Sequence, residues 1–257
     1  MILSKRIALN GNQLDEINDA IVIRSIDPGI TKESISATSK MGGSGQRMTS
    51  QRWETLEVVV RFAILIQKWE MARRREVFEQ VIAWAMQKGW LTVNWMPERR
   101  LYVDYVQIPG SGDMWEWTDE IQLVFRAYNI PFWLDETPAQ AVSGTQASGT
   151  LTIQVGGNVE SVIDATFANK SGMTIQNFKI AAGGNEIKLA GLNLGGSATL
   201  KIDHRTDGLL RIRIGSTSVY EKYTGADDLI VKPGSVNVTF TADRAGILTV
   251  QNYGRHV

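Results

Sequence analysis

The sequence predicts an α+β N-terminal domain, an antiparallel β-sandwich or barrel with one covering α-helix, followed by an all-β sandwich or jelly roll. Two observations lead to this fold class. Between Trp53 and Tyr128, a strand pattern gives way to a single helical pattern and then returns to strands. From residue 150 onward, β-rich segments separated by turn residues recur at roughly 8–12-residue spacing, and no helical period is visible.

Residues 1–52 are expected to form two strands and a long loop. Lys5–Leu9 and Ala20–Ile26 are β-rich, and Asn10-Gly11 between them is a turn signal. Residues 34–52 then have little apolar content and several glycines. A connection of this length is uncommon in a compact domain. Two interpretations stay open: a mobile surface loop, or a loop that orders against a neighbouring subunit.

The central stretch begins with a core strand, because apolar residues occupy every second position from Leu56 to Ile66. Residues 67–88 then show helical spacing, with Arg73–Arg75 and their acidic neighbours on a solvated face. The apolar stripe of this helix consists of Met71, Phe78, Val81, Ile82, Ala85 and Met86. Three strands follow, predicted at Leu91–Trp95, at Leu101–Ile108 and in the segment that ends at Ala127.

Composition changes sharply after Tyr128, which predicts a domain boundary. Prolines and glycines lie among small polar residues, and all 8 tryptophans precede residue 134. The predicted organisation is a first domain at 1–135, a linker at 136–149 and a second domain at 150–257. Strands of the second domain are predicted at Thr150–Val155, Val159–Ala168, Met173–Ala181, Glu186–Leu194, Ala198–His204, Leu209–Ile214, Ser218–Tyr223, Ser235–Ala242 and Ile247–Tyr253.

Charge and cysteine content exclude several classes of function. Lys+Arg and Asp+Glu both number 27, divided as 16 of each before residue 134 and 11 of each after it. This balance does not suggest electrostatic binding to nucleic acid or to an anionic membrane. Without cysteine, the chain has neither disulfides nor thiolate chemistry. The first residues lack the apolar core of a signal peptide, and no apolar run is long enough to span a bilayer, so a soluble, unexported chain is expected.

A search for catalytic or metal-binding patterns returns no candidate. The two histidines, His204 and His256, have no nucleophile motif beside them and are too few for a conventional zinc site. Asp227-Asp228 lacks the spacing of a calcium loop and is interpreted as a plain loop. We therefore expect no catalytic residues, no metal and no cofactor.

Aromatic residues cluster toward the end of the first domain. Trp115 and Trp117 are two apart on one predicted strand, and Pro131, Phe132 and Trp133 follow. Such a cluster fits packing in the core or at a domain junction, a subunit interface, or a ligand site. We assign Pro131, Phe132 and Trp133 to a domain junction.

The order of these elements resembles the distal tail (Dit) proteins of long-tailed, non-contractile phages. The resemblance is carried by R-W-E-T-L-E-V-V-V-R-F, the helix E-V-F-E-Q-V-I-A-W-A-M-Q-K-G-W-L, R-R-L-Y-V-D-Y-V, and W-T-D-E-I-Q-L-V-F-R-A-Y-N-I-P-F-W. It covers residues 1–135, and the β-rich remainder agrees with the galectin-like domain of that family. Each motif is degenerate by itself, and only their order is informative.

The resemblance implies a structural role in the virion. The N-terminal domain would be tail-tube-like and form a ring, a homohexamer in that family, at the tail tip or baseplate after assembly in the host cytoplasm. DNA would pass through the ring without specific binding. Partners would be the tail tube protein, the tail hub or tail-associated protein and a receptor-binding protein, with no membrane contact. The loop at 40–52 would be the inter-subunit element, through Lys40, Met41, Gly42, Gly43, Gly45, Arg47 and Arg52.

Two other functions stay open. A carbohydrate-binding or adhesion module on a virion or cell surface would fit a β-sandwich with exposed aromatics. The galectin sugar-binding pattern itself does not carry over, because His204-Arg205 stands without its companion residues and the C-terminal half has no tryptophan. A glycoside hydrolase is favoured only by scattered carboxylates.

Overall fold

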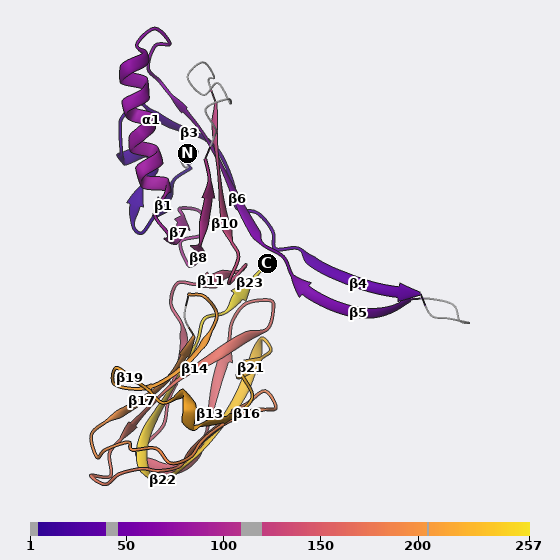
Figure 1. The fold of residues 1–257 in the computed structure, drawn as a ribbon, viewed down its shortest axis with the longest axis vertical. Helices are drawn as coiled ribbons and strands as arrows, with labels where there is room; N and C mark the ends of the chain where they lie inside the picture. The colour runs from indigo at the N-terminus through magenta and orange to yellow at the C-terminus, as the bar shows by residue number, and fades with distance from the viewer. Residues whose placement is uncertain (1–4, 40–45, 109–119, 205) are drawn as a thin grey trace. The chain divides into compact units, whose positions relative to one another are not determined.

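The computed structural model describes residues 5–39, 46–108, 120–204 and 206–257 (Figure 1). The chain divides into two compact units, Met1–Trp133 with Val257, called unit 1, and Leu134–His256, called unit 2. The predicted β-rich fold with one helix is confirmed, and the described strand pairs are antiparallel. The assignment of two domains stays a prediction, which the Discussion puts to a test.

Unit 1 contains the one helix of the described residues, α1 (Met71–Ala85), and a short 3₁₀ turn at Leu14–Glu16. One of its sheets has the order β3-β6-β10-β9, and another contains the order β2-β1-β7-β8. The strands, ending with β11 at the unit boundary, are β1 (Ile7–Leu9), β2 (Asn12–Gln13), β3 (Ile21–Asp27), β4 (Glu33–Ser39), β5 (Gln46–Trp53), β6 (Leu56–Ile64), β7 (Gly89–Val93), β8 (Arg99–Val103), β9 (Tyr105–Gln107), β10 (Ile121–Ala127) and β11 (Trp133–Asp135).

Strand β6 is the centre of unit 1, as the alternating pattern predicts. It pairs with β3 on one side and β10 on the other, and Leu56, Val58, Val60 and Phe62 are fully buried. Residues of both sheets and of α1 join one hydrophobic cluster. Trp84 from the helix meets Phe125 from β10 edge to face, with ring centroids 5.7 Å apart. The helix therefore covers the core, and Figure 1 shows it alongside the strands.

The buried face of the helix differs from the predicted stripe, because Val77 and Trp84 are also buried and two further positions are reversed. Phe78, Val81 and Ala85 are buried, but Met86 is 66% exposed because it lies at the C-cap, beyond the last helical residue. Arg74, expected on the solvated face, is buried instead. Its guanidinium donates hydrogen bonds to the carbonyl oxygens of Ile64 at 2.9 Å and Ile66 at 3.2 Å, where β6 ends. Buried backbone carbonyl oxygens at the end of a strand need hydrogen-bond donors, and the Arg74 guanidinium supplies them here.

The long loop expected at 34–52 is wrong as a secondary-structure assignment. β4 and β5 form a two-stranded hairpin, in register from Glu33 opposite Trp53 to Ser39 opposite Gln46, with an irregularity after Ser36. These residues are extended, and Ile35, Ser36 and Ala37 are exposed. An alternating apolar pattern marks a strand only where one face is buried, so exposed residues such as these three give no strand signal in the sequence.

Unit 2 is built from the remaining strands and a 3₁₀ turn at Tyr220–Lys222. The sheet order is β19-β18-β17-β14-β22-β15-β16-β20, with β12 and β13 also pairing with β22, and β21 with β14. The strands are β12 (Ala139–Val142), β13 (Gln146–Val155), β14 (Ser161–Asn169), β15 (Phe178–Ala182), β16 (Asn185–Leu189), β17 (Thr199–His204), β18 (Leu210–Ile214), β19 (Thr217–Ser218), β20 (Tyr223–Gly225), β21 (Ile230–Val231), β22 (Gly234–Asn252) and β23 (Arg255–His256).

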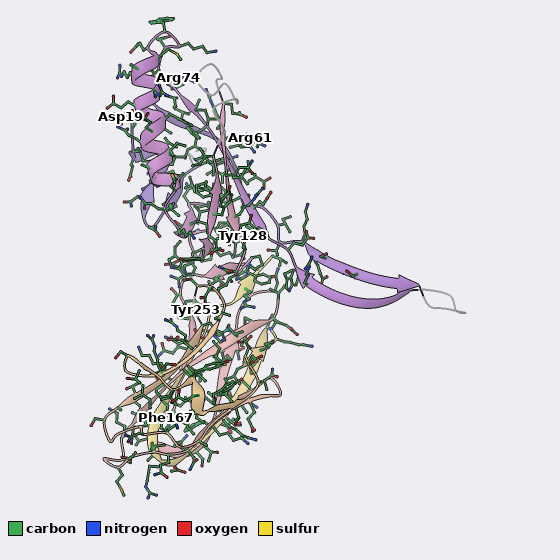
Figure 2. All side chains as sticks on the ribbon, in the orientation of Figure 1. Asp19, Arg61, Arg74, Tyr128, Phe167 and Tyr253 are labelled. Carbon is green, nitrogen blue, oxygen red and sulfur yellow. The ribbon has the colours of Figure 1, made fainter. Side chains whose placement is uncertain are left out.

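One long strand replaces the two that the sequence predicts near the end of the chain. β22 runs through Asp243–Gly246, where a turn was expected. Its first half pairs with β13 and β15, and its second half with β12 and β14. By changing neighbours in this way, β22 joins the strands of unit 2 into one curled sheet. Phe167, Phe178 and Phe240 lie in the single core that this sheet encloses, and Figure 2 labels Phe167.

The expected linker at 136–149 also differs from the structure. It contains β12 and the first residues of β13, and both strands pair with β22. Small residues such as Ala139 and Ala141 resemble a linker in composition, yet they pack against the core of unit 2. Pairing with an existing strand supplies the hydrogen bonds that composition does not reveal.

Candidate functional site: an assembly surface on unit 1

The hairpin β4–β5 is the most distinctive surface feature of unit 1. Among the described strands, its two members pair only with each other. Of the predicted inter-subunit residues, Arg47 and Arg52 lie in β5, opposite Thr38 and Ser34. Lys40, Met41, Gly42, Gly43 and Gly45 fall outside the described residues, as do Trp115 and Trp117. The predicted element is therefore a strand pair where it is described.

Contacts with the segment 131–133 anchor the base of this hairpin. The Thr31 hydroxyl donates a hydrogen bond to the carbonyl oxygen of Pro131. Trp53, the last residue of β5, meets the ring of Phe132 edge to face at 5.4 Å. Phe132 and Trp133 are 4% and 3% exposed. The aromatic residues assigned to a domain junction thus pack inside unit 1, against the segment that leads into the hairpin.

A tight turn fixes the direction in which the chain enters β4. The backbone N–H of Gly29 donates to the Asp27 carboxylate at 3.0 Å, and the Trp133 indole N–H donates to the carbonyl oxygen of Pro28 at 3.1 Å. Gly29 has φ +68°, and a Cβ there would lie 2.0 Å from the carbonyl oxygen of Glu57. Only glycine fits this turn without displacing β6.

A pocket of about 770 Å³ opens beside the hairpin base, and we call it the hairpin-base pocket. Its wall mixes exposed apolar side chains with charges of both signs. Ile30 is 74% exposed and Tyr128 51%, close to Trp53 at 39%. Aromatic and arginine side chains with this exposure are typical of protein–protein interfaces. The lining residues are Asp27, Gly29, Ile30, Lys32, Arg52, Trp53, Glu54, Thr55, Glu57, Val59 and Tyr128.

A network of polar contacts at the edge of the pocket holds its shape. Arg126 forms an ion pair with Glu57 at 2.7 Å, and its guanidinium also donates to Gln107 at 3.1 Å. The Asp104 carboxylate accepts hydrogen bonds from the backbone N–H groups of Tyr128 and Asn129. Tyr128, labelled in Figure 2, is thereby fixed in position while its ring stays exposed.

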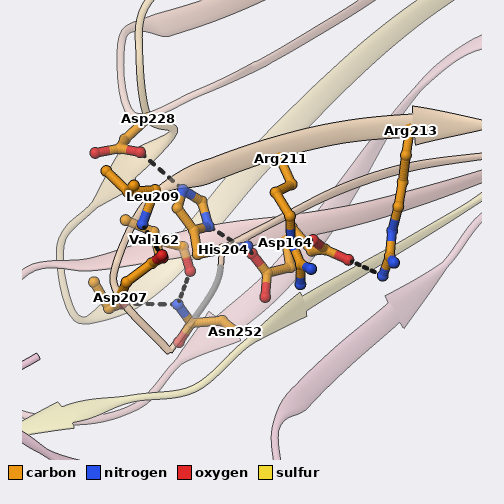
Figure 3. Close-up of polar contacts among 11 residues, drawn as sticks. Val162, Asp164, His204, Asp207, Leu209, Arg211, Arg213, Asp228 and Asn252 are labelled. Atoms are coloured by element: carbon orange, nitrogen blue, oxygen red, sulfur yellow. Dashed lines mark hydrogen bonds and ion pairs between the residues drawn. The ribbon is translucent and has the colours of Figure 1, made fainter. Parts of the chain in front are cut away.

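A second polar cluster lies in unit 2 around His204, whose side chain is 9% exposed. Its Nδ1 lies 2.7 Å from Asp164 and its Nε2 lies 2.8 Å from Asp228 (Figure 3). Carboxylates accept hydrogen bonds, so a carboxylate beside each ring nitrogen favours the doubly protonated imidazolium form. Burial lowers the pKa of His204, but the two carboxylates outweigh burial and the net pKa is raised. The cluster fastens the loop at Asp227-Asp228 to strands β14 and β17.

His204 and its partners could not be grouped from sequence. Asp164, His204 and Asp228 lie on separate segments, and only the curled sheet brings them together. Arg205 falls outside the described residues. The other histidine is also held, because Nε2 of His256 lies 2.7 Å from Asp135, although residues this close to a chain end are often poorly ordered. The ring nitrogens of both histidines lie beside carboxylates and not beside a nucleophilic hydroxyl. In the described part of the chain, no cluster of His, Asp or Glu is placed to hold a metal ion.

Comparisons with known proteins identify the fold. No family model matches the sequence, and no curated protein is significantly similar to it. The structure is similar to that of the SPP1 Dit protein, described as a paradigm of the hub adsorption apparatus in phages that infect Gram-positive bacteria. The TM-score is 0.64 at 12% identity, over 96% of this chain and 98% of that chain.

Two structures of the phage P2 baseplate in its activated conformation, with Ca and with Sr, give TM-scores of 0.47 and 0.45. Both are 10% identical to this chain and cover 99% and 96% of it, and 98% and 97% of the matched chains. The SPP1 Dit likeness, which extends over nearly the whole of both chains, assigns the same fold to this protein. Searching the described residues, we find no helix long and apolar enough to cross a membrane.

Proposed function

We propose that this protein is a structural ring component of the tail tip or baseplate of a long-tailed, non-contractile phage. The observation that carries the proposal is the likeness to SPP1 Dit, because it extends through both units in the same chain order and leaves almost no part of either chain unmatched. A fold by itself does not fix a function. The proposal therefore also draws on the assembly surface of unit 1 and on the absence of a catalytic motif in the sequence.

In the proposed assembly, unit 1 forms a closed ring, a hexamer, between the tail tube and the tail hub. The hairpin β4–β5 reaches the neighbouring subunit, and Arg52 and Trp53 take part in that contact. An isolated two-stranded hairpin is marginally stable in water, so a neighbour that covers it would supply the missing buried area. DNA passes through the ring without specific binding, in keeping with the balanced charge of unit 1.

Unit 2 serves in this proposal as a docking platform for a tail hub or receptor-binding protein. The protein has no catalytic role. Its position in the virion follows from the ring, and assembly takes place in the host cytoplasm.

The test is the mass of the purified chain by light scattering, with electron micrographs of the same peak, alone and with the cognate tail tube and hub proteins. We expect a ring of about six copies with a central hole. Arg52→Glu should reduce ring formation, because it reverses a charge at the hairpin base. Arg73→Glu is the matched control, since Arg73 is an exposed arginine on the helix, and it should leave the ring intact. A chain that stays monomeric with both partners present would rule out the ring.

A further inference from the structure

Unit 2 contains a pocket of about 560 Å³ beside β18, β19 and the 3₁₀ turn Tyr220–Lys222. We call it the Tyr220 pocket. Its lining includes Leu209, Arg211, Ser218, Tyr220, Asp227 and Asp228. The volume lies within the range of about 300–1,000 Å³ that is usual for small-molecule sites.

Two charged side chains of the Tyr220 pocket, Asp228 and Arg211, are each held by a residue outside its lining, and Figure 3 labels both. Asp228 is bound by His204 at 2.8 Å, and His204 is fixed from its other side by Asp164. Arg211 donates from Nε to Asp203 at 3.1 Å. The Tyr223 hydroxyl lies 3.1 Å from the carbonyl oxygen of Gly225 and 3.4 Å from the Asp227 carboxylate, so Asp227 competes with Gly225 for its one proton. Polar groups positioned in this way do not need to be ordered by a ligand, which lowers the cost of binding.

The aromatic wall of the pocket is supported in the same way. The Tyr220 ring is 46% exposed and packs against the Tyr223 ring at 5.3 Å. Burial, followed by the nearby Asp227 charge, raises the pKa of Tyr223 to about 12. The Tyr223 hydroxyl thus keeps its proton, which it can donate to the carbonyl oxygen of Gly225 or to Asp227. Leu209, 62% exposed, adds an apolar surface close to Tyr220.

The chemistry of this lining favours a neutral ligand rich in hydroxyl groups. Arg211 and Ser218 supply donors, Asp227 and Asp228 supply acceptors, and Tyr220 offers a flat face for C–H groups. The lining carries one arginine and two aspartates. Because Arg211 is paired with Asp203 and Asp228 with His204, most of this charge is already balanced within the protein.

We propose that the Tyr220 pocket binds a saccharide, with Tyr220 stacking on one face of a sugar ring and Asp227, Asp228 and Arg211 binding its hydroxyl groups. This activity goes beyond the ring role and does not require assembly, so it would be present in a monomeric chain.

The first test is a titration of the full chain, with labelled leucine and isoleucine methyl groups, followed by nuclear magnetic resonance. The probes are methyl glycosides of the common hexoses, deoxyhexoses and N-acetylhexosamines. Nα-acetyl-lysine methylamide and glycerol phosphate are the charged comparators. We expect at least one glycoside to shift the methyl signals of Leu209, Leu210 and Ile212, and neither charged probe to do so. If no glycoside shifts these methyl signals, or if a charged probe shifts them equally, the proposal is wrong.

The second test uses variants of the pocket with controls in unit 1. Tyr220→Ala should raise the dissociation constant of the best glycoside by about three- to tenfold, the range that aromatic contacts contribute. Asp227→Asn, which keeps the shape of the side chain, should also weaken binding. It tests the pocket independently if Tyr220→Ala fails to fold. Trp69→Ala and Asp19→Asn change an exposed tryptophan and an exposed aspartate in unit 1 and should bind like the parent. Equal weakening by pocket and control variants would contradict the proposed site.

Discussion

At the scale of single residues, His204 is the group whose environment departs most from what its sequence context suggests. Its side chain, 9% exposed, lies between two carboxylates, and the half-buried Arg255 is near enough to interact with both of those carboxylates. A charge removed from water is tolerated only when it is paired and hydrogen-bonded, and here both ring nitrogens are. His204 therefore serves as a clamp for the Asp228 loop.

The charge state of this clamp predicts a pH dependence of stability. The folded pKa of His204 is raised above its ordinary value of 6.5. Its contribution is therefore fully present below about 6.5 and is lost as the pH rises through the folded pKa. His204→Gln keeps at most one of the two bonds, and should lower the free energy of unfolding by about 1–3 kcal/mol at pH 6.

Urea unfolding of the parent and of His204→Gln across pH 6–9 measures this contribution, because the difference between the two curves isolates the histidine. The difference should shrink as the pH rises. A difference that is constant with pH would show that the ring binds as neutral imidazole and that the clamp is not ionic.

At the scale of elements, α1 is held to unit 1 by more than its apolar face. Phe78 and Val81 are buried in the core. Arg74 donates hydrogen bonds from the helix to the carbonyl oxygens at the end of β6. Figure 2 labels Arg74 on the helix. In the triplet Arg73–Arg75, the central arginine is therefore buried and hydrogen-bonded, whereas the arginines on either side of it are exposed.

This distinction predicts different costs for neighbouring arginines. Arg74→Met keeps the aliphatic stem but leaves the carbonyl oxygens of Ile64 and Ile66 without their donor, which should cost about 1–3 kcal/mol of stability. Arg73→Met is the control, because exposed substitutions usually stay within about 0.5 kcal/mol. Urea unfolding at neutral pH compares them. Equal values for the two variants would mean that water replaces the guanidinium.

At the scale of the whole molecule, each unit has a hydrophobic core of its own, and no residue is shared between the two clusters. Separate cores predict separate unfolding transitions. Phe125→Ala and Phe167→Ala form a matched pair, since Phe125 is fully buried in unit 1 and Phe167 is 1% exposed in unit 2. Each should lower the stability of its own unit by roughly 3–5 kcal/mol.

Differential scanning calorimetry distinguishes the outcomes. Two transitions, each moved by only one of the variants, would establish two domains. A single transition that both variants shift alike would mean that the chain unfolds as one cooperative body, and the predicted division into domains would be wrong.

The sequence by itself determined the elements that bury a face. The alternation from Leu56 onward predicts β6, the helical spacing around Phe78 and Val81 predicts α1, and the turn residues after 150 predict most strands of unit 2. A buried face requires apolar residues to recur at the period of the helix or strand, and this period can be read from the amino-acid sequence.

Only the tertiary structure decided the features that depend on contacts between distant segments. The hairpin β4–β5 forms although Ile35, Ser36 and Ala37 are exposed, β12 resembles a linker, and β22 runs through an apparent turn because β12 and β14 pair with its second half. The grouping of Asp164, His204 and Asp228, and with it the Tyr220 pocket, has the same origin. Pairing and polar contacts across the fold leave no periodic trace in the chain, because their geometry is set by the partner strand rather than by the neighbouring residue.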